Sequence, residues 1–176
     1  MATAARARAG KKLSLKGRAL ALLAQREHSA AELRRKLLRH AKAELAGTAG
    51  DATDASDASA GVDALIDWLR AHRYLSEERF IESRVHARSA RYGNLRIRQE
   101  LAQHGLALPS QAVQALKDTE LQRAQEVWRR KFGVVAGDAA QRARQARFLA
   151  QRGFSPEVIG RVVRGAATAE VPGDDG

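Results

Sequence analysis

The 176-residue sequence contains no cysteine, only three prolines and few aromatic residues, which make up 5% of the chain. Without cysteine the chain has neither disulfides nor thiolate chemistry. No apolar run approaches the roughly 20 residues of a membrane span, and no hydrophobic segment of signal-peptide length follows the basic N-terminus. We therefore expect a cytoplasmic protein that does not enter a membrane.

Strand signals are also missing, because no run of β-branched or aromatic residues alternates with a period of two. Helix signals are frequent. Ser29 and Glu32 form a capping box, Pro156 suits the first position of a helix, and Gly105 and Gly153 suit a left-handed residue just after one. The pattern predicts nine helices, near residues 16–26, 29–42, 62–73, 76–91, 94–104, 110–117, 120–131, 139–152 and 156–164.

One helical segment occurs three times along the chain. The copy from Arg96 to Leu106 is matched by the copy from Arg144 to Phe154, 48 positions later, and a fainter copy from Leu33 to His40 lies 64 positions earlier and lacks the glycine. The two spacings differ by about the length of the low-complexity stretch 43–61. The sequence thus predicts an all-α fold of three tandem three-helix, helix-turn-helix-like repeats in an elongated array. Such arrays present long surfaces and usually bind rather than catalyse.

The repeats give the expected domain boundaries. Repeat 1 covers 13–75, repeat 2 covers 76–118 and repeat 3 covers 119–164. Repeat 1 carries an acidic insertion at 43–60. We expect disorder in this insertion, in the basic tail 1–12 and in the acidic tail 165–176, because their small and polar residues cannot bury enough apolar surface to fold.

The net charge of +11 is unevenly distributed. Residues 43–61 hold four acids and no base, and residues 165–176 hold three acids and no base, so the remainder of the chain carries +18. A field of that size attracts polyanions, either nucleic acid or an acidic protein surface. A basic surface that is merely solvated is the alternative.

No group of residues resembles a catalytic, metal or cofactor site. The five histidines form no close pair of ligands, and no cysteine can complete a zinc site. His40 and His104 share one repeat position, which Arg152 occupies in the third copy, so a basic residue at a helix C-terminus explains them better. We expect a protein that is not an enzyme and that has no metal or cofactor.

The arginines are more informative. On the helix expected at 76–91, Arg88 lies nearly in line with Ile81, so we expect a half-buried guanidinium paired with a carboxylate such as that of Glu100. Other basic residues are candidates for binding a partner. Arg35, Arg39 and Lys42 lie away from Leu33 and Leu37 and look solvated, whereas for the cations of 129–131 and for Arg144, Arg147 and Arg152 a plainly solvated role suits equally well. These candidates are Arg35, Arg39, Lys42, Arg96, Arg98, Arg129, Arg130, Lys131, Arg144, Arg147 and Arg152.

Several motifs together resemble the bacterial RecX family of regulatory proteins. Its central signature is similar to Tyr74–Phe80 followed by Arg88, Gly93, Ile97, Glu100, Leu101 and Gly105. Its first repeat is similar to Ala19–Leu37, and its third to Arg130–Phe132, Arg147–Leu149 and Arg152–Ser155. The resemblance covers roughly residues 19–163. The acidic insertion is longer than the family pattern, and His104 stands where the family favours lysine.

The resemblance implies three tandem three-helix units and a regulator of DNA recombination, DNA repair and the SOS response. Such a protein binds RecA filaments on single-stranded DNA, inhibits their recombinase and coprotease activities, and can also contact DNA. Because lysine and arginine dominate the candidate surface, we expect any direct DNA contact to be weak, indifferent to sequence and strongly dependent on salt. We expect a monomer. The alternative is a sequence-nonspecific DNA-binding helical protein that acts on DNA directly and affects RecA only by competing for the strand.

Overall fold

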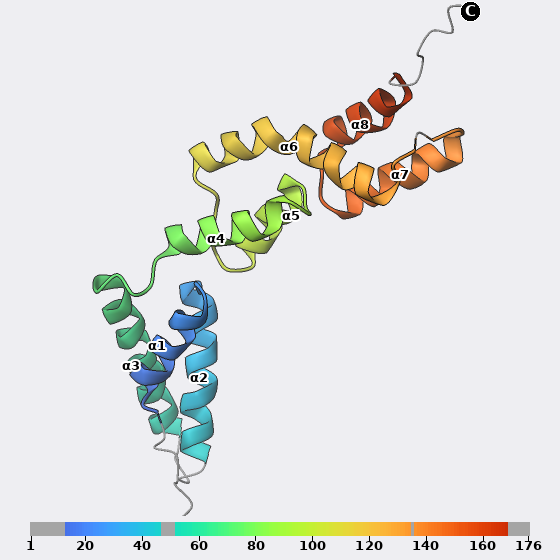
Figure 1. Ribbon diagram of the computed structural model, residues 1–176. Helices are drawn as coiled ribbons and strands as arrows, with labels where there is room; N and C mark the ends of the chain where they lie inside the picture. The colour runs from blue at the N-terminus through green and yellow to red at the C-terminus, as the bar shows by residue number, and fades with distance from the viewer. Residues whose placement is uncertain (1–12, 47–51, 135, 169–176) are drawn as a thin grey trace, which may run out of the picture. The chain divides into compact units, whose positions relative to one another are not determined.

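The computed structural model describes residues 13–46, 52–134 and 136–168, and within these ranges every regular element is an α-helix (Figure 1). The prediction of an all-α fold is therefore confirmed. The chain divides into two compact units, residues 1–77 and 78–176. Their helices are α1 (Leu15–Gln25), α2 (Ala30–Ala46) and α3 (Ala52–Ala71) in the first unit, and α4 (Glu77–Ser89, beginning at the boundary), α5 (Asn94–Ala102), α6 (Ser110–Lys131), α7 (Ala139–Gln151) and α8 (Pro156–Thr168) in the second.

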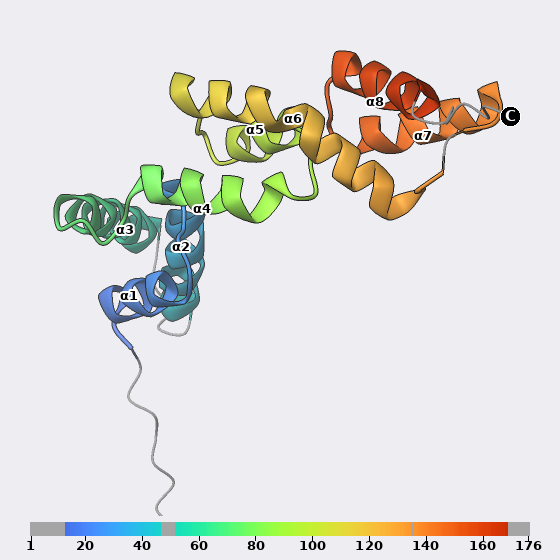
Figure 2. The same ribbon diagram turned by 45° about the horizontal axis from the view of Figure 1, so that its top comes forward.

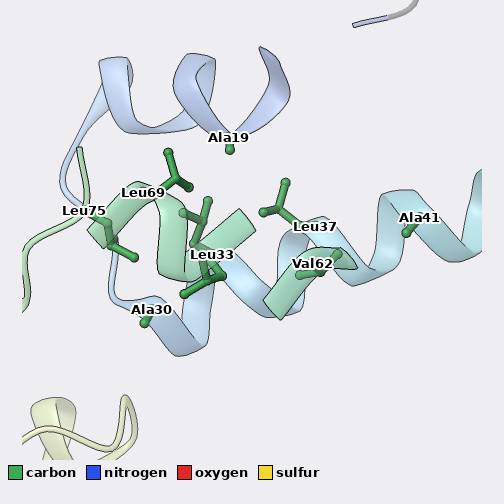
Figure 3. Close-up of a cluster of buried hydrophobic side chains, with 9 residues drawn as sticks. Ala19, Ala30, Leu33, Leu37, Ala41, Val62, Leu69 and Leu75 are labelled. Atoms are coloured by element: carbon green, nitrogen blue, oxygen red, sulfur yellow. The ribbon is translucent and has the colours of Figure 1, made fainter. Parts of the chain in front are cut away.

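In the first unit α2 and α3 lie side by side and run antiparallel (Figure 1), and α1 packs against α2 (Figure 2). Leu33 and Leu37, one turn apart on α2, face Val62 and Leu69 of α3, and Leu75 closes the end of this core (Figure 3). All five side chains are buried. Burying a side chain of this size contributes about 1.5–3 kcal/mol, so the core accounts for the association of helices that would be marginal alone.

The acidic insertion differs from the prediction. The sequence predicted disorder across 43–60. This prediction is wrong for residues 43–46, which end α2, and for residues 52–60, which begin α3. Residues 47–51 lie outside the described ranges. Alanine is the strongest helix former, and the insertion is rich in it. Ala58 also packs against the core, and the Arg34 Nη2 donates to Ser59 Oγ at 3.2 Å. Of the expected disordered tails, 1–12 and 169–176 also lie outside the described ranges, while 165–168 belong to α8.

Helix α6, in the second unit, runs from the expected repeat 2 into the expected repeat 3. Two helices, 110–117 and 120–131, were expected here, but the structure has one. The segment between them contains neither proline nor glycine, and Gln114 Nε2 donates to Asp118 Oδ1 at 2.7 Å along the helix surface. Leu116, near the start of α6, is buried with residues of α4 and α5, whereas Trp128, near its end, is buried with residues of α7 and α8.

The two repeats meet through close backbone contacts. The Gly93 N–H donates to the Arg152 carbonyl at 2.9 Å, and the Leu95 N–H donates to the Gly153 carbonyl at 3.0 Å. Gly153 has φ +79° and Gly105 has φ +72°. The prediction of left-handed glycines at both helix ends is therefore confirmed.

Buried Glu120 of α6 supports the same junction. Its Oε1 accepts the Asn94 N–H at 3.0 Å and the Ser155 N–H at 3.3 Å, and its Oε2 accepts from Ser155 Oγ at 3.0 Å. Asn94 begins α5 and Ser155 precedes α8. One carboxylate thus satisfies the N-termini of two helices, where the helix dipole also favours a negative charge.

One turn further along α6, the Arg123 guanidinium binds the end of α4. It donates to the carbonyls of Ser89 at 3.1 Å and Tyr92 at 2.8 Å and to Asn94 Oδ1 at 2.6 Å. Burial lowers the pKa of Arg123, and the charge of Glu120 counteracts this. Arg123 therefore serves as a structural cation that fixes the turn between α4 and α5.

Candidate partner-binding surface

Three arginines surround the ring of Tyr92 in the second unit. The guanidinium carbons of Arg88, Arg96 and Arg152 lie 5.6, 5.7 and 5.6 Å from the ring centroid. Arg88 comes from α4, Arg96 from α5, and Arg152 caps the C-terminus of α7. These distances fit cation–π attraction, so the aromatic ring gathers positive charge from three helices at one place.

Two hollows, of about 360 and 400 Å³, are lined in part by the arginines that contact this tyrosine. The first is lined by Arg84, Arg88, Arg96, Gln99, Glu100, Gln103 and His104. The second is lined by Ala90, Arg91, Tyr92, Val127, Arg130, Lys131, Phe148 and Arg152. Their linings together hold seven lysines and arginines but only one acid. We call these seven cations, with Tyr92, the basic strip.

Glu100 is the one carboxylate that lines the basic strip. Arg88 Nε donates to Glu100 Oε2 at 2.9 Å, and the Arg88 side chain is 35% exposed. The predicted half-buried Arg88–Glu100 pair is thereby confirmed. Arg96 Nε lies 3.8 Å from the other carboxylate oxygen. Glu100 thus holds two of the guanidiniums that contact Tyr92.

At the other end of the strip, α6 and α7 supply the cations. Arg152 lies 5.0 Å from the Phe148 ring centroid, and its Nη1 donates to the Arg91 carbonyl at 3.4 Å. Arg130 pairs with Glu126 at 3.4 Å, with its side chain 64% exposed. The cations at this end are therefore oriented by neighbouring groups yet remain open to a partner.

The structure brings four of the predicted binding residues together: Arg96, Arg130, Lys131 and Arg152 belong to the basic strip. Arg98 is exposed beside a different hollow of about 590 Å³. The others are exposed outside these hollows. They are Arg35, Arg39 and Lys42 on α2 of the first unit, Arg129 on α6, and Arg144 and Arg147 on α7.

Sequence reasoning missed Tyr92 and Phe148, which position the cations, and did not assign Arg84 or Arg91 to binding. Tyr92 directly precedes Gly93, the glycine at the junction of the two repeats. An aromatic residue directly before a glycine at the junction was the one sequence feature that could have indicated this site.

One repeat position needs correction. His104 and Arg152 lie at helix ends as expected, but His40 lies within α2, which continues to Ala46. The first copy lacks the glycine that ends the helix in the other two. At the end of α5, the His104 ring contacts the Phe80 ring edge-on, with ring centroids 5.0 Å apart.

Across the described ranges, no group of three or more His, Asp or Glu side chains is arranged to hold a metal ion. Nor is any helix within them both long and apolar enough to span a membrane.

Comparison with known proteins identifies both repeats of the second unit. Residues 76–108 match the second three-helix domain of RecX, and residues 118–163 match its third. The chain is 48% identical over 154 residues to the regulatory protein RecX of Leptothrix cholodnii, covering 86% of this chain and 88% of that one. It is 45% identical over 166 residues to the regulatory protein RecX of Ralstonia nicotianae, covering 93% and 94%.

Proposed function

The chain belongs to the RecX family of regulatory proteins, and from this we propose that it binds RecA filaments on single-stranded DNA and inhibits their recombinase and coprotease activities. It acts as a binding protein and not as an enzyme. In this proposal the repeats are 13–75, 76–118 and 119–164, with the boundary between the last two inside α6, and the protein works as a cytoplasmic monomer.

The observation that carries the proposal is the basic strip. Guanidiniums form paired hydrogen bonds with carboxylates and phosphates, the two anionic groups that a protein–DNA filament presents. Arg88, Arg96 and Arg152 are already oriented by Tyr92 and Glu100. Side chains that are ordered before binding lose less conformational entropy when a partner arrives. The strip therefore suits an extended acidic surface better than scattered lysines would.

The remaining candidate cations provide further contacts in this proposal. Arg98, Arg129, Arg144 and Arg147 extend the positive charge of the second unit, and Arg35, Arg39 and Lys42 supply charge on the first. Exposed charges of this kind steer association and add little affinity individually.

Direct action on DNA is the second candidate function, favoured by the net charge of +18 outside the two acidic segments. Phosphate contacts release counterions, so this mode would be indifferent to sequence and would weaken steeply with salt. Binding to RecA in the absence of DNA would favour the first candidate, because only that candidate includes a direct contact with RecA.

The test uses preformed RecA filaments on single-stranded DNA. Purified protein is added over a range of concentrations while RecA-dependent ATP hydrolysis and strand exchange are followed, and both should slow. The double substitution Arg91→Gln and Lys131→Gln, within the basic strip, removes two exposed cations and should weaken this inhibition about tenfold.

A matched control removes the same charge elsewhere. Arg142 and Arg164 are exposed residues of the second unit outside both hollows of the strip. Arg142→Gln with Arg164→Gln should inhibit like the parent protein. Equal weakening in both double variants would show that overall charge matters and the strip does not, and unchanged hydrolysis with the parent protein would overturn the proposal.

A further inference from the structure

Three aromatic rings stack at the surface of the first unit, where α3 ends. The Trp68 and His72 ring centroids are 4.1 Å apart with planes inclined by 25°, and those of Trp68 and Tyr74 are 5.6 Å apart with planes inclined by 18°. We call these three residues the aromatic platform. It is separate from the basic strip, which lies in the second unit.

The local backbone builds the platform. Trp68 and His72 are one helical turn apart, and the His72 Nδ1 lies 2.8 Å from the Trp68 carbonyl, so that nitrogen donates. Arg73 then adopts φ +60°, a conformation that is costly for a residue with a Cβ. The left-handed turn lets the Tyr74 N–H donate to the Leu69 carbonyl at 2.9 Å, which returns the tyrosine towards Trp68.

A buried residue holds this turn in place. Leu75, directly after the tyrosine, is 3% exposed in the core of the first unit, whereas Tyr74 itself is 49% exposed. The strained turn therefore places one side chain in the core and leaves an aromatic ring at the surface. Core packing accounts for Leu75 but not for the exposed ring beside it.

A cation already lies against the platform. Lys16 Nζ, from α1, is 3.5 Å from the Trp68 ring centroid. This ammonium occupies the position that a quaternary ammonium ligand would take in an aromatic cage, which argues against such a ligand. It also places a positive charge beside the stacked rings, where a phosphate attached to a stacked base would be attracted.

We propose that the aromatic platform, with Lys16, binds an unpaired nucleobase and its phosphate in single-stranded nucleic acid. Stacking of a base on an aromatic side chain contributes about 1–3 kcal/mol and tolerates any base, because every base has a π face. The bases of a duplex are already stacked on each other, so the platform distinguishes single strands from duplexes. Binding here does not require RecA.

The experiment measures binding of a fluorescent oligothymidine to the full-length protein without RecA, by anisotropy. Tyr74→Ala should weaken binding about 5- to 150-fold, which corresponds to the loss of one stacked base. Tyr74→Phe keeps the ring and should bind like the parent protein. Lys16→Gln should weaken binding and reduce its salt dependence. Affinity for a duplex of the same length should be the same for Tyr74→Ala and the parent protein.

Tryptophan fluorescence gives a second readout. The chain has two tryptophans, and Trp128 is buried with its indole N–H donating to Gln145 at 2.9 Å. In a Trp128→Phe background, shown to be folded by its circular dichroism, oligothymidine should quench Trp68. If Tyr74→Ala retains its helical content and binds oligothymidine as tightly as the parent protein, or if it loses duplex and single-strand binding equally, the platform is not the site. RecA inhibition by Tyr74→Ala is scored separately, so a failure here leaves the proposed function testable.

Discussion

A Cβ atom added to Gly93 would lie 2.2 Å from the carbonyl oxygen of Gly153. These two glycines come from different repeats and allow the backbones of the second and third repeats to hydrogen-bond directly. The same contact positions Tyr92 on one side and Arg152 on the other, so the arginines at the tyrosine ring depend on the absence of two side chains. The junction between the repeats therefore also determines where Arg152 lies relative to Tyr92 in the basic strip.

The first prediction concerns this junction. Gly93→Ala places a methyl group against backbone atoms that cannot move aside, because the same Cβ also lies 2.3 Å from the Phe154 Cα. We expect a loss of about 3 kcal/mol in the free energy of unfolding, measured by urea denaturation. Gly61→Ala is the control, since nothing lies within 4 Å of a Cβ at this exposed position in α3. It should stabilise the protein by about 0.5–1 kcal/mol. Equal stability of the two variants would contradict the close approach.

The second prediction concerns the carboxylate of Glu120, which is only 4% exposed. Glu120→Ala leaves the N–H groups of Asn94 and Ser155 without their acceptor, and we expect a loss of about 3 kcal/mol. Glu120→Gln keeps one acceptor oxygen and should lie between this variant and the parent protein. Glu126→Ala, on the same helix, removes a carboxylate that is 41% exposed and should change stability by less than about 1 kcal/mol. A Glu120→Ala variant as stable as Glu126→Ala would show that the capping contacts contribute nothing.

The third prediction tests whether Arg88 and Glu100 act as a pair. Arg88→Ala should destabilise the protein, because it removes a partly buried stem and leaves a carboxylate without its closest partner. A double-mutant cycle with Glu100→Ala should give a coupling energy of about 1 kcal/mol in thermal or urea denaturation. Arg91→Ala, an exposed position at the other end of the basic strip, is the control and should show no coupling to Glu100. Additive effects of Arg88→Ala and Glu100→Ala would refute the pair.

Local patterns in the sequence predicted several of these features correctly. The left-handed glycines and the start of α8 follow from the backbone preferences of glycine and proline, and the half-buried position of Arg88 follows from its spacing to Ile81 along α4. Composition misled the prediction at 52–60, where acidic and small residues suggested disorder but alanine and the contacts of Ala58 and Ser59 support a helix.

Features that depend on tertiary contacts could not be predicted in the same way. From the sequence alone, Glu120 is expected at the surface of a short helix. In the structure it is buried, because α5 and α8 both begin beside its carboxylate. The gathering of arginines around Tyr92 depends on a junction that brings together residues distant in the sequence, such as Arg88 and Arg152. Such sites become visible only when the packing of the helices is known.

The last prediction is a dependence of stability on pH that originates at Glu32. Burial by itself raises the pKa of this carboxyl, but hydrogen bonds from Arg26 and the charges of Arg26 and Lys36 outweigh burial and lower the pKa from 4.5 to about 2. Because the pKa is lower in the folded state, the carboxylate stabilises the protein above pH 4.5, and this contribution is lost as the pH falls towards 2. The stabilisation amounts to about 3 kcal/mol for a pKa shift of this size.

Glu32→Gln, a neutral side chain of the same shape, should therefore be less stable than the parent protein at pH 7 and nearly as stable at pH 2. Urea denaturation across this range measures the difference. Asp67→Asn, at a carboxyl that is 76% exposed, should show almost no difference at either pH. A constant gap between Glu32→Gln and the parent protein from pH 7 to pH 2 would mean that the charge of Glu32 does not stabilise the fold.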